Sequence, residues 1–342
     1  MDDTMNVGKI TGEGLMAIES EMTRQHEDAI ASFETATELA RRIAEALRTR
    51  RRVILLGMGG SHAVNRMVEV DYRAQGIQAF AVTLSEQLYS PLDLADAAVI
   101  VTSQSGESAE VHRMLADLAA HGASYGITLE AGSALARAVP SLVGAGGSER
   151  AFAATRSLTI TLALHLSILS ALGLDAEPSL SALRARVRLD VTDAIKLLKP
   201  ARAVIYSGRT LRGLAEAAAL STMELARMPA YALEGGQFRH GPLEALGPAL
   251  GAVHFCADEP AVPLVGGLAR DTVAGGSPTV VFDASGSDEI HGDLILRFPK
   301  ASGLAATLTM LPTAQRLAIG LAGQRVSNVG VPLRTTKITR AE

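Results

Sequence analysis

The sequence predicts an α/β protein with two tandem, doubly wound domains, each a mostly parallel sheet flanked by helices. Its length of 342 residues suits two domains at about 150 residues each. Short apolar runs that end at glycine alternate with longer stretches of helical periodicity, which is the pattern of βαβ units. The alternation starts again after Pro200, so the second half repeats the element order of the first.

The first half opens with a helical pattern over residues 13–50, read as one or two helices. Residues 53–56 are apolar on both faces, as in a central strand of a parallel sheet. Further helices are expected at 61–74, 108–121 and 154–172, and further strands at 79–82, 97–101, 124–128 and 141–143.

The second half begins with a helix expected over 180–198, and a strand at 204–208 then resembles the first strand in character. Its other elements are expected as helices at 211–228 and 304–322 and strands at 252–256, 279–282 and 294–296. The domain division predicted is an N-terminal helical segment at 1–34, domains at 35–176 and 177–325, and a tail at 326–342.

Composition excludes several classes of function. A net charge of −4 disfavours nucleic-acid binding, and 4% aromatic residues without tryptophan argue against stacking on bases. Cys256 lies in an apolar run and is interpreted as a buried structural thiol. The chain lacks a signal-peptide pattern, and its most apolar segment, 158–174, is short and contains polar residues, so we expect no membrane partner and a cytoplasmic location.

No cofactor is expected from the sequence. His62, His112 and His121 have no companions at metal-ligand spacing, so no metal site is predicted. No nicotinamide or flavin motif is present.

Two loops carry the candidate binding chemistry, and the first is Gly57–Ser61, which joins a predicted strand to a predicted helix. Gly59 and Gly60 let the backbone approach a ligand, and Ser61 adds a hydroxyl at a helix N-terminus, which favours an anion. The run is neither a dinucleotide fingerprint nor a P-loop. A plain tight turn between strand and helix explains it equally well.

The second loop, Ser103-Gln104-Ser105-Gly106-Glu107-Ser108, is more specific. It follows an apolar strand and opens a helix, and its hydroxyl and amide groups are suited to coordinate phosphate oxygens without cationic side chains. Ser105 or Ser108 alone fits a simple helix cap. A cap needs one such residue, however, and Ser103, Gln104, Ser105 and Ser108 are together here.

This serine-rich loop, paired with the glycine loop upstream, resembles the signature of the sugar-isomerase (SIS) family, which includes the isomerase half of glucosamine-6-phosphate synthase. The resemblance runs from about residue 15 to the end of the chain. It implies that Ser61, Ser103, Gln104, Ser105 and Ser108 bind a sugar phosphate.

The resemblance also assigns catalytic roles. Glu224, followed sixteen positions later by His240 in a His-Gly-Pro motif, matches the family's spacing. It implies that Glu224 moves a proton between C1 and C2 and that His240 assists ring opening or acts as an acid, with His240 supplied by the partner of a homodimer. Proton transfer beside a carbonyl independently requires a carboxylate tuned by partial burial. Taken alone, Glu224 also fits an ordinary surface residue of a helix. Taken alone, His240 also fits a residue that forms hydrogen bonds within a loop.

Lys337 matches the family's C-terminal lysine, which is suited to form a Schiff base with an open-chain ketose. The match implies that the C-terminal tail lies over the active site. Several departures stand against the synthase reaction. Ser221 replaces a second lysine, Ala154 replaces a serine, Leu333 interrupts a Pro-Arg pair, and a glutaminase domain is not expected.

The reactions left open are amino sugar phosphate deamination, aldose–ketose isomerisation of a sugar phosphate, and cleavage of 6-phosphofructosyl amino acids by a deglycase. A non-catalytic sugar-phosphate sensor is an alternative of another class. Such regulators resemble this chain in their SIS domain, but they carry an N-terminal DNA-binding domain for which too few residues precede the sheet. Retention of both Glu224 and His240 favours an enzyme.

Overall fold

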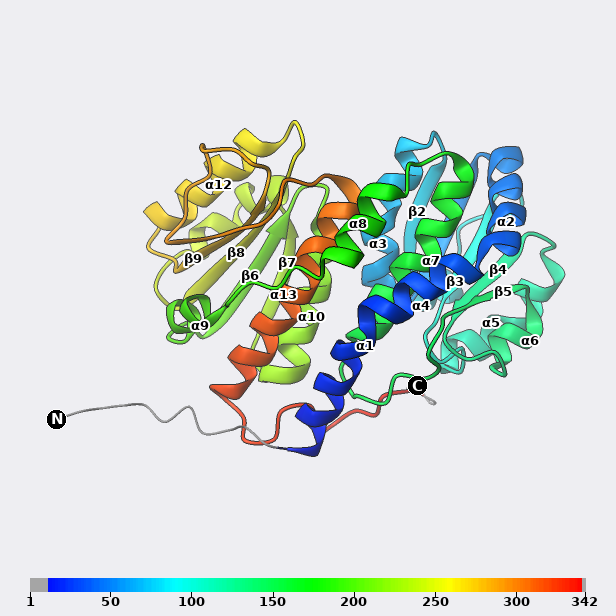
Figure 1. Ribbon diagram of the computed structural model, residues 1–342, viewed down its shortest axis with the longest axis horizontal. Helices are drawn as coiled ribbons and strands as arrows, with labels where there is room; N and C mark the ends of the chain where they lie inside the picture. The colour runs from blue at the N-terminus through cyan, green and yellow to red at the C-terminus, as the bar shows by residue number, and fades with distance from the viewer. Residues whose placement is uncertain (1–11, 340–342) are drawn as a thin grey trace.

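The computed structural model describes residues 12–339, and it contains two five-stranded sheets set side by side and flanked by helices (Figure 1). All strand-to-strand pairings described are parallel, which confirms the predicted parallel sheets. The first sheet has the order β2-β1-β3-β4-β5 and the second, taken from its opposite edge, β7-β6-β8-β9-β10. The repeat of element order predicted from the sequence is therefore present.

The first sheet is built from the first half of the chain. Its strands are β1 (Arg52–Gly57), β2 (Gln78–Thr83), β3 (Ala98–Thr102), β4 (Ser124–Thr128) and β5 (Ser141–Val143). Its helices are α1 (Glu13–Thr35), α2 (Thr37–Arg50), α3 (Gly59–Ala74), α4 (Leu84–Tyr89), α5 (Ala109–Ala120), α6 (Ala134–Ala138) and α7 (Arg156–Leu172).

The second sheet is built from the second half. Its strands are β6 (Ala203–Gly208), β7 (Ala230–Glu234), β8 (Leu250–Ala257), β9 (Thr279–Ala284) and β10 (Leu294–Arg297). The helices are α8 (Glu177–Ala185), α9 (Thr192–Leu198), α10 (Arg212–Ala226), α11 (Gly235–Arg239), α12 (Val262–Ala274) and α13 (Gly303–Gly323), with a 3₁₀ turn at Pro242–Ala245.

The single helix predicted over 180–198 was wrong, because the chain forms α8 and α9 with a break between them. Arg186 adopts the left-handed conformation, with φ 48°, and ends α8. Within the break, the amide of Leu189 donates to the hydroxyl of Thr313 on α13, 3.3 Å away. Contact with α13 thus replaces the intrahelical hydrogen bonding that the periodicity suggested.

Strand β7 and the helices α4, α6, α11 and α12 were not anticipated. β7 is an edge strand whose residues are mostly half-buried or exposed, so it lacks the apolar run that marks the other strands. Helix α12 contains Gly266 and Gly267, which weaken its helical signal.

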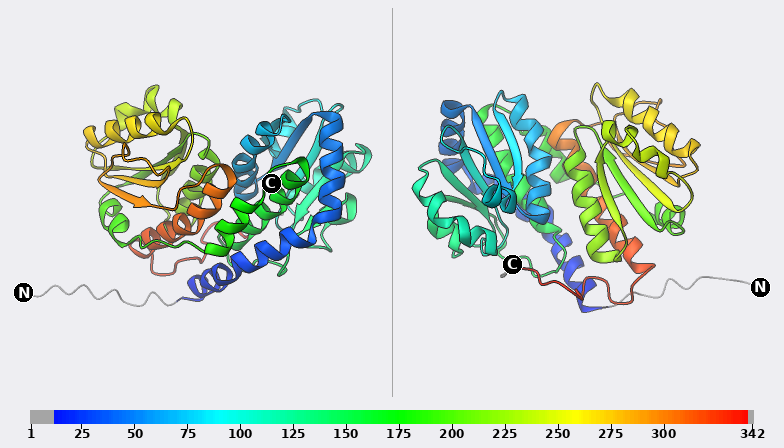
Figure 2. Two further views of the ribbon diagram at one scale, coloured as in Figure 1. Left: turned by 45° about the horizontal axis from the view of Figure 1, so that its top comes forward. Right: turned by 180° about the vertical axis from the view of Figure 1, so that it is seen from behind.

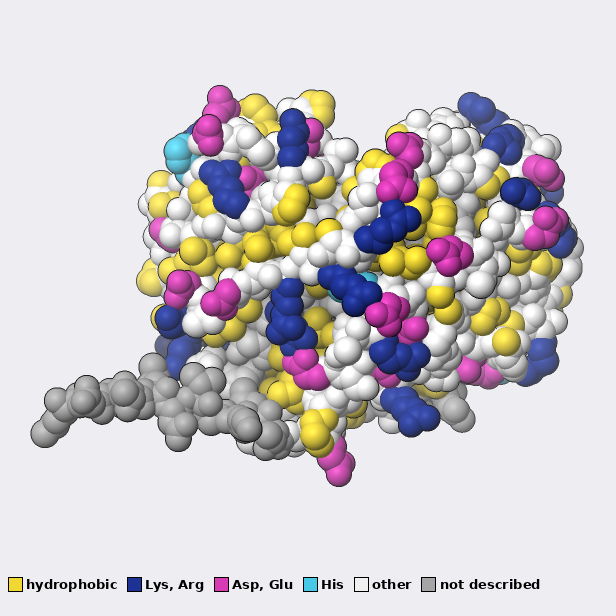
Figure 3. Space-filling model, viewed as in Figure 1, with side chains coloured by type: hydrophobic (Ala, Val, Ile, Leu, Met, Phe, Trp, Pro, Cys, Tyr) yellow, Lys and Arg dark blue, Asp and Glu magenta, His cyan; other side chains and the backbone are white. Residues whose placement is uncertain are grey.

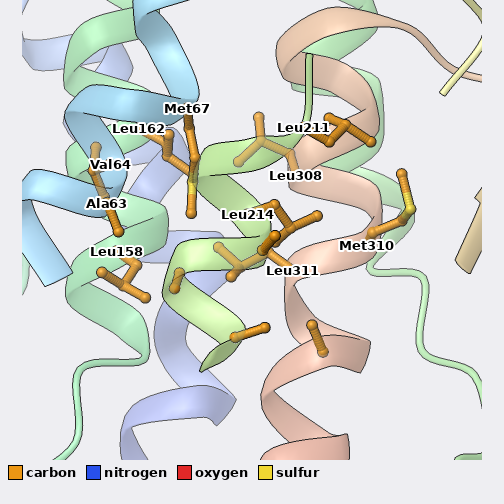
Figure 4. Packing of buried hydrophobic residues seen from close by; sticks show 14 of the residues in the cluster. Ala63, Val64, Met67, Leu158, Leu162, Leu211, Leu214, Leu308, Met310 and Leu311 are labelled. Atoms are coloured by element: carbon orange, nitrogen blue, oxygen red, sulfur yellow. The ribbon is translucent and has the colours of Figure 1, made fainter. Parts of the chain in front are cut away.

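Four helices, α3, α7, α10 and α13, fill the space between the sheets and share one apolar core (Figures 2 and 4). Helices α3 and α10 run antiparallel, since Gly59 faces Leu220 and Gly213 lies against Met67. A Cβ at Gly213 would lie 2.3 Å from the amide nitrogen of Met67. Only glycine permits this approach, which brings the later turns of α10 beside the start of α3.

The surface is mixed in charge, with Lys, Arg, Asp and Glu side chains interspersed over the face in Figure 3. Among the described residues, no helix has both the length and the apolar character needed to cross a membrane.

Asp71 on α3 ties the two halves together at a buried position. Its carboxylate accepts a hydrogen bond from the amide of Leu304 in the first turn of α13, and burial raises its pKa to about 7. A buried carboxyl that ionises near neutrality opposes folding once it is charged.

Asp71→Asn should therefore make the free energy of unfolding less dependent on pH. The folded-state pKa of about 7 lies above the ordinary value of 3.8, so the folded state binds more protons between these values and stability falls as pH rises through that window. The variant should exceed the wild type by about 1–2 kcal/mol at about pH 8 and show little gain at about pH 4. Urea denaturation at both pH values measures this, and an equal difference at both would contradict it.

Candidate active site

A cavity of about 490 Å³ opens at the C-terminal end of the first sheet, a volume typical of sites for small ligands. Its walls come from the β1–α3 loop, the β3–α5 loop, the segment after β4, the β5–α7 loop, helix α10 and the C-terminal tail. The lining residues are Met58, Gly59, Gly60, Ser61, Ser103, Gln104, Ser105, Ser108, Leu129, Glu130, Ser148, Glu149, Phe152, Ala154, Leu220, Glu224, Thr335, Thr336, Lys337, Ile338 and Thr339.

The strand order explains why the cavity lies there. From β1 the chain moves to β2 on one side and then to β3 on the other, so the loops after β1 and β3 diverge. In doubly wound sheets a crevice forms at such a reversal, outside the carboxyl ends of the strands. The two loops singled out from the sequence, 57–61 and 103–108, follow these two strands.

The serine-rich loop folds around its own amides. The hydroxyl of Ser103 accepts from the amide of Gly106 at 3.1 Å, and that of Ser105 accepts from the amide of Glu107 at 3.2 Å. Each hydroxyl uses only a lone pair in these bonds, so it can still donate its hydrogen to an oxyanion. Gly106 has φ 62°, and a Cβ there would lie 2.3 Å from the Oγ of Ser133, so the turn requires glycine.

Ser108 is the N-cap of α5, and its Oγ accepts from the amide of Val111 at 3.4 Å. The capping interpretation is thus correct for Ser108, which also lines the cavity. Since α5 begins at the cavity, the positive end of its dipole faces the same space. The loop offers hydroxyl donors and a helix N-terminus to an anion.

Glu224 lies on α10 and lines the same cavity as this loop. Leu220, one turn earlier on the same helix, also lines the cavity. Burial raises the pKa of Glu224 to about 7; Lys337 acts to lower it and Glu149 to raise it. A carboxyl with a pKa near neutrality is suited to accept and return a proton.

Glu149, which the sequence analysis missed, is the most heavily hydrogen-bonded carboxylate of the site. Its side chain is 1% exposed, and it accepts from the amide of Thr155 at 2.9 Å and from the hydroxyl of Ser157 at 2.5 Å. It also pairs with the Nζ of Lys337 at 3.1 Å. The glycine-rich run 144–147 after β5 was the available signal, because such loops commonly carry ligand contacts.

A second layer of charge holds the loop that carries Glu149. The guanidinium of Arg156, at the start of α7, donates to Glu21 at 2.5 Å, to Asp28 at 2.9 Å and to the carbonyl of Gly147 at 2.6 Å. Helix α1 is thereby fixed against this loop, because a buried guanidinium needs its anionic partners.

The tail reaches the cavity from the far end of the chain. Residues 335–339 line it, and Lys337 donates to the carbonyl of Ala151 as well as pairing with Glu149. The carbonyl of Thr339 accepts from the amide of Ala109, the first residue of α5, at 3.0 Å. The tail is therefore joined both to the Glu149 loop and to the helix behind the serine-rich loop.

Nine of the ten sequence-predicted site residues line the cavity, namely Gly59, Gly60, Ser61, Ser103, Gln104, Ser105, Ser108, Glu224 and Lys337. The tenth, His240, lies at the end of α11 and is exposed to solvent, outside the lining of this cavity. Within residues 12–339, no group of three or more His, Cys, Asp or Glu side chains is arranged to hold a metal ion.

Comparison with known proteins places these features in a family context. No family model matches the chain. It is 29% identical over 296 residues to a glutamine–fructose-6-phosphate aminotransferase (isomerizing) of Aeropyrum pernix, covering 79% of this chain and 48% of the relative. The same enzyme of Sulfurisphaera tokodaii is 28% identical over 233 residues, covering 65% and 39%. The chain thus spans less than half the length of the curated relatives it matches.

Solved structures share the whole fold. The C-terminal domain of glucosamine-fructose-6-phosphate aminotransferase from Francisella tularensis superposes with a TM-score of 0.82 at 18% identity, covering 92% of this chain and 98% of that one. The chain is a relative of the sugar-isomerase (SIS) proteins. Tagatose-6-phosphate ketose/aldose isomerase of Escherichia coli matches this chain with a TM-score of 0.77 at 20% identity, covering 93% and 97%. Glucosamine-6-phosphate deaminase of Thermotoga maritima matches it at 0.69 and 18%, covering 91% and 99%.

Proposed function

We propose that the chain is an enzyme that binds a sugar 6-phosphate and transfers a proton between C1 and C2, as an amino sugar phosphate isomerase or deaminase of the glucosamine-6-phosphate type. The observation that carries the proposal is the meeting of a serine-rich anion loop and Glu224 in one cavity. The pKa of about 7 at Glu224 supports its role as the base.

In the proposed mechanism, the phosphate binds at the N-terminus of α5 and receives hydrogen bonds from Ser61, Ser103, Ser105 and Ser108 and from the amide of Gln104. Anchoring one end of the sugar fixes the distance from its other end to Glu224, which supplies the orientation that proton transfer needs. Lys337, held by Glu149, places an amine beside the reacting carbons. The relatives' names, which refer to fructose 6-phosphate and glucosamine 6-phosphate, agree with this substrate class.

We propose the domain division 1–34, 35–176, 177–325 and 326–342 on the same basis. The serine-rich loop then belongs to the first SIS domain, Glu224 and His240 to the second, and Lys337 to the tail. The part of 1–34 that the structure describes is Gly12 and most of α1, which packs on α7 of the first domain.

The residue at position 221 favours deamination and isomerisation over the synthase reaction, because it is not a lysine. Ser221 is buried on α10, one turn before Glu224, where the synthase has a lysine. Lys337 is then the one amine that lines the described cavity, and it is paired with Glu149. A deglycase acting on 6-phosphofructosyl amino acids needs the same proton transfer and is the second candidate.

Release of ammonia and ketose phosphate from glucosamine 6-phosphate should be lost in Glu224→Gln. Removal of a general base lowers kcat by about 10²–10⁴-fold, while binding of the phosphate end is retained. Glu216→Gln is the matched control, since Glu216 lies on the same helix, has a pKa raised by burial and does not line the cavity. It should keep full activity.

Three outcomes separate the candidates. Activity that persists in Glu224→Gln would contradict the assignment of the base. If glucosamine 6-phosphate gives no product but 6-phosphofructosyl amino acids do, the deglycase is correct. If the wild type binds these compounds and turns over none of them, the chain is a sensor.

We propose further that the active site is composite and the protein a homodimer, with His240 supplied by the partner subunit. His240 is exposed and does not line the cavity of its own chain, which supports this arrangement. Glu224→Gln and His240→Ala chains, each inactive alone, should regain activity when refolded together, because a mixed dimer contains one intact site. If confirmed mixed dimers recover no activity, the proposal of a composite site is wrong.

A further inference from the structure

The charges that line the cavity do not balance. Three carboxylates, Glu130, Glu149 and Glu224, face one described cation, Lys337, and no described arginine lines the cavity. Glu149 and Lys337 compensate each other as an ion pair. Among the described residues that line the cavity, Glu130 is therefore a carboxylate with no cation paired to it, and it has no role in the mechanism above.

An unpaired carboxylate at this place works against a phosphate ligand. A phosphate monoester brings about −1.5 to −2 charges at neutral pH, and like charges in a partly dry cavity repel. The α5 dipole offsets only part of this repulsion. The Glu130 carboxylate would thus weaken the binding of a sugar phosphate that has no amine. It would strengthen the binding of a sugar phosphate that also carries an ammonium group.

Glu130 is held in place from two sides. Its backbone amide donates to the hydroxyl of Thr128 at 3.2 Å, and Thr128 in turn donates to the carbonyl of Gln104 in the serine-rich loop at 3.1 Å. On the opposite side, the hydroxyl of Ser148 donates to an Oε of Glu130. Ser148 precedes Glu149 directly, so Glu130 spans from the phosphate side of the cavity to the loop that holds Lys337.

We infer that the cavity selects sugar phosphates bearing a protonated amine and that Glu130 is the specificity-determining residue that receives it. The inference rests on the function proposed above and narrows it to amine-bearing substrates. The amine is carried at C2, as in glucosamine 6-phosphate, or at C1, as in 1-amino-1-deoxyfructose 6-phosphate; both present the same ammonium group.

The test compares ligands that differ by one charge. Calorimetric titration in the Glu224→Gln background, which prevents turnover, gives Kd for glucosamine 6-phosphate, glucose 6-phosphate, N-acetylglucosamine 6-phosphate and 1-amino-1-deoxyfructose 6-phosphate. With Glu130 present, one or both amine-bearing ligands should bind tighter than glucose 6-phosphate and N-acetylglucosamine 6-phosphate, which lack the ammonium group. Adding Glu130→Gln should weaken amine binding about tenfold and leave glucose 6-phosphate binding equal or tighter.

Asp117→Asn is the matched control, because Asp117 is an exposed acid on α5 that does not line this cavity, and the same loss of charge there should move no Kd. Retained glucose 6-phosphate binding shows that the variant is folded. If Glu130→Gln weakens all ligands alike, or none, the inference is wrong while the phosphate site stands. If the Glu224→Gln protein with Glu130 intact binds none of the four, the proposed function fails together with the inference.

Discussion

The antiparallel packing of α3 on α10 is the constraint on which the candidate site depends. The glycine loop and the serine-rich loop follow strands of the first sheet, and Glu224 lies on the helix that follows β6, so neither half contains the candidate site alone. Gly213 lets α10 contact the backbone of α3 at Met67, and the antiparallel direction then carries Leu220 and Glu224 to the start of α3. A side chain at position 213 would push the helices apart and move the carboxyl away from the serine-rich loop.

Around this junction the site is assembled from paired charges in layers. Arg156, with Glu21 and Asp28, fixes the loop after β5; that loop presents Glu149; and Glu149 holds Lys337 of the tail. Breaking a buried pair leaves an uncompensated charge, so each layer stabilises the next. The result is a cavity lined both by hydroxyl groups at a helix N-terminus and by a carboxyl of raised pKa.

The sheets, and most residues that line the candidate cavity, could be predicted from the sequence because their signals are local. Apolar runs marked the central strands, and serine clusters at strand ends marked the anion loop. It missed β7, whose edge position leaves no apolar run, and it joined α8 to α9 because the left-handed Arg186 has no sequence signature. Glu130 and Glu149 were missed for a related reason: their roles arise from contacts to Ser148 and Lys337, which only the folded chain brings together. His240 is exposed and lies outside the cavity lining of its own chain, so its match to a motif did not predict where it lies in the fold.

The most direct test of the central claim is a crystal structure of the Glu224→Gln protein with glucosamine 6-phosphate bound. The account predicts the phosphate at the N-terminus of α5, within hydrogen-bonding distance of Ser103 and Ser108, and the C1–C2 end of the sugar against position 224. A phosphate bound elsewhere, or a sugar that leaves position 224 out of contact, would contradict it.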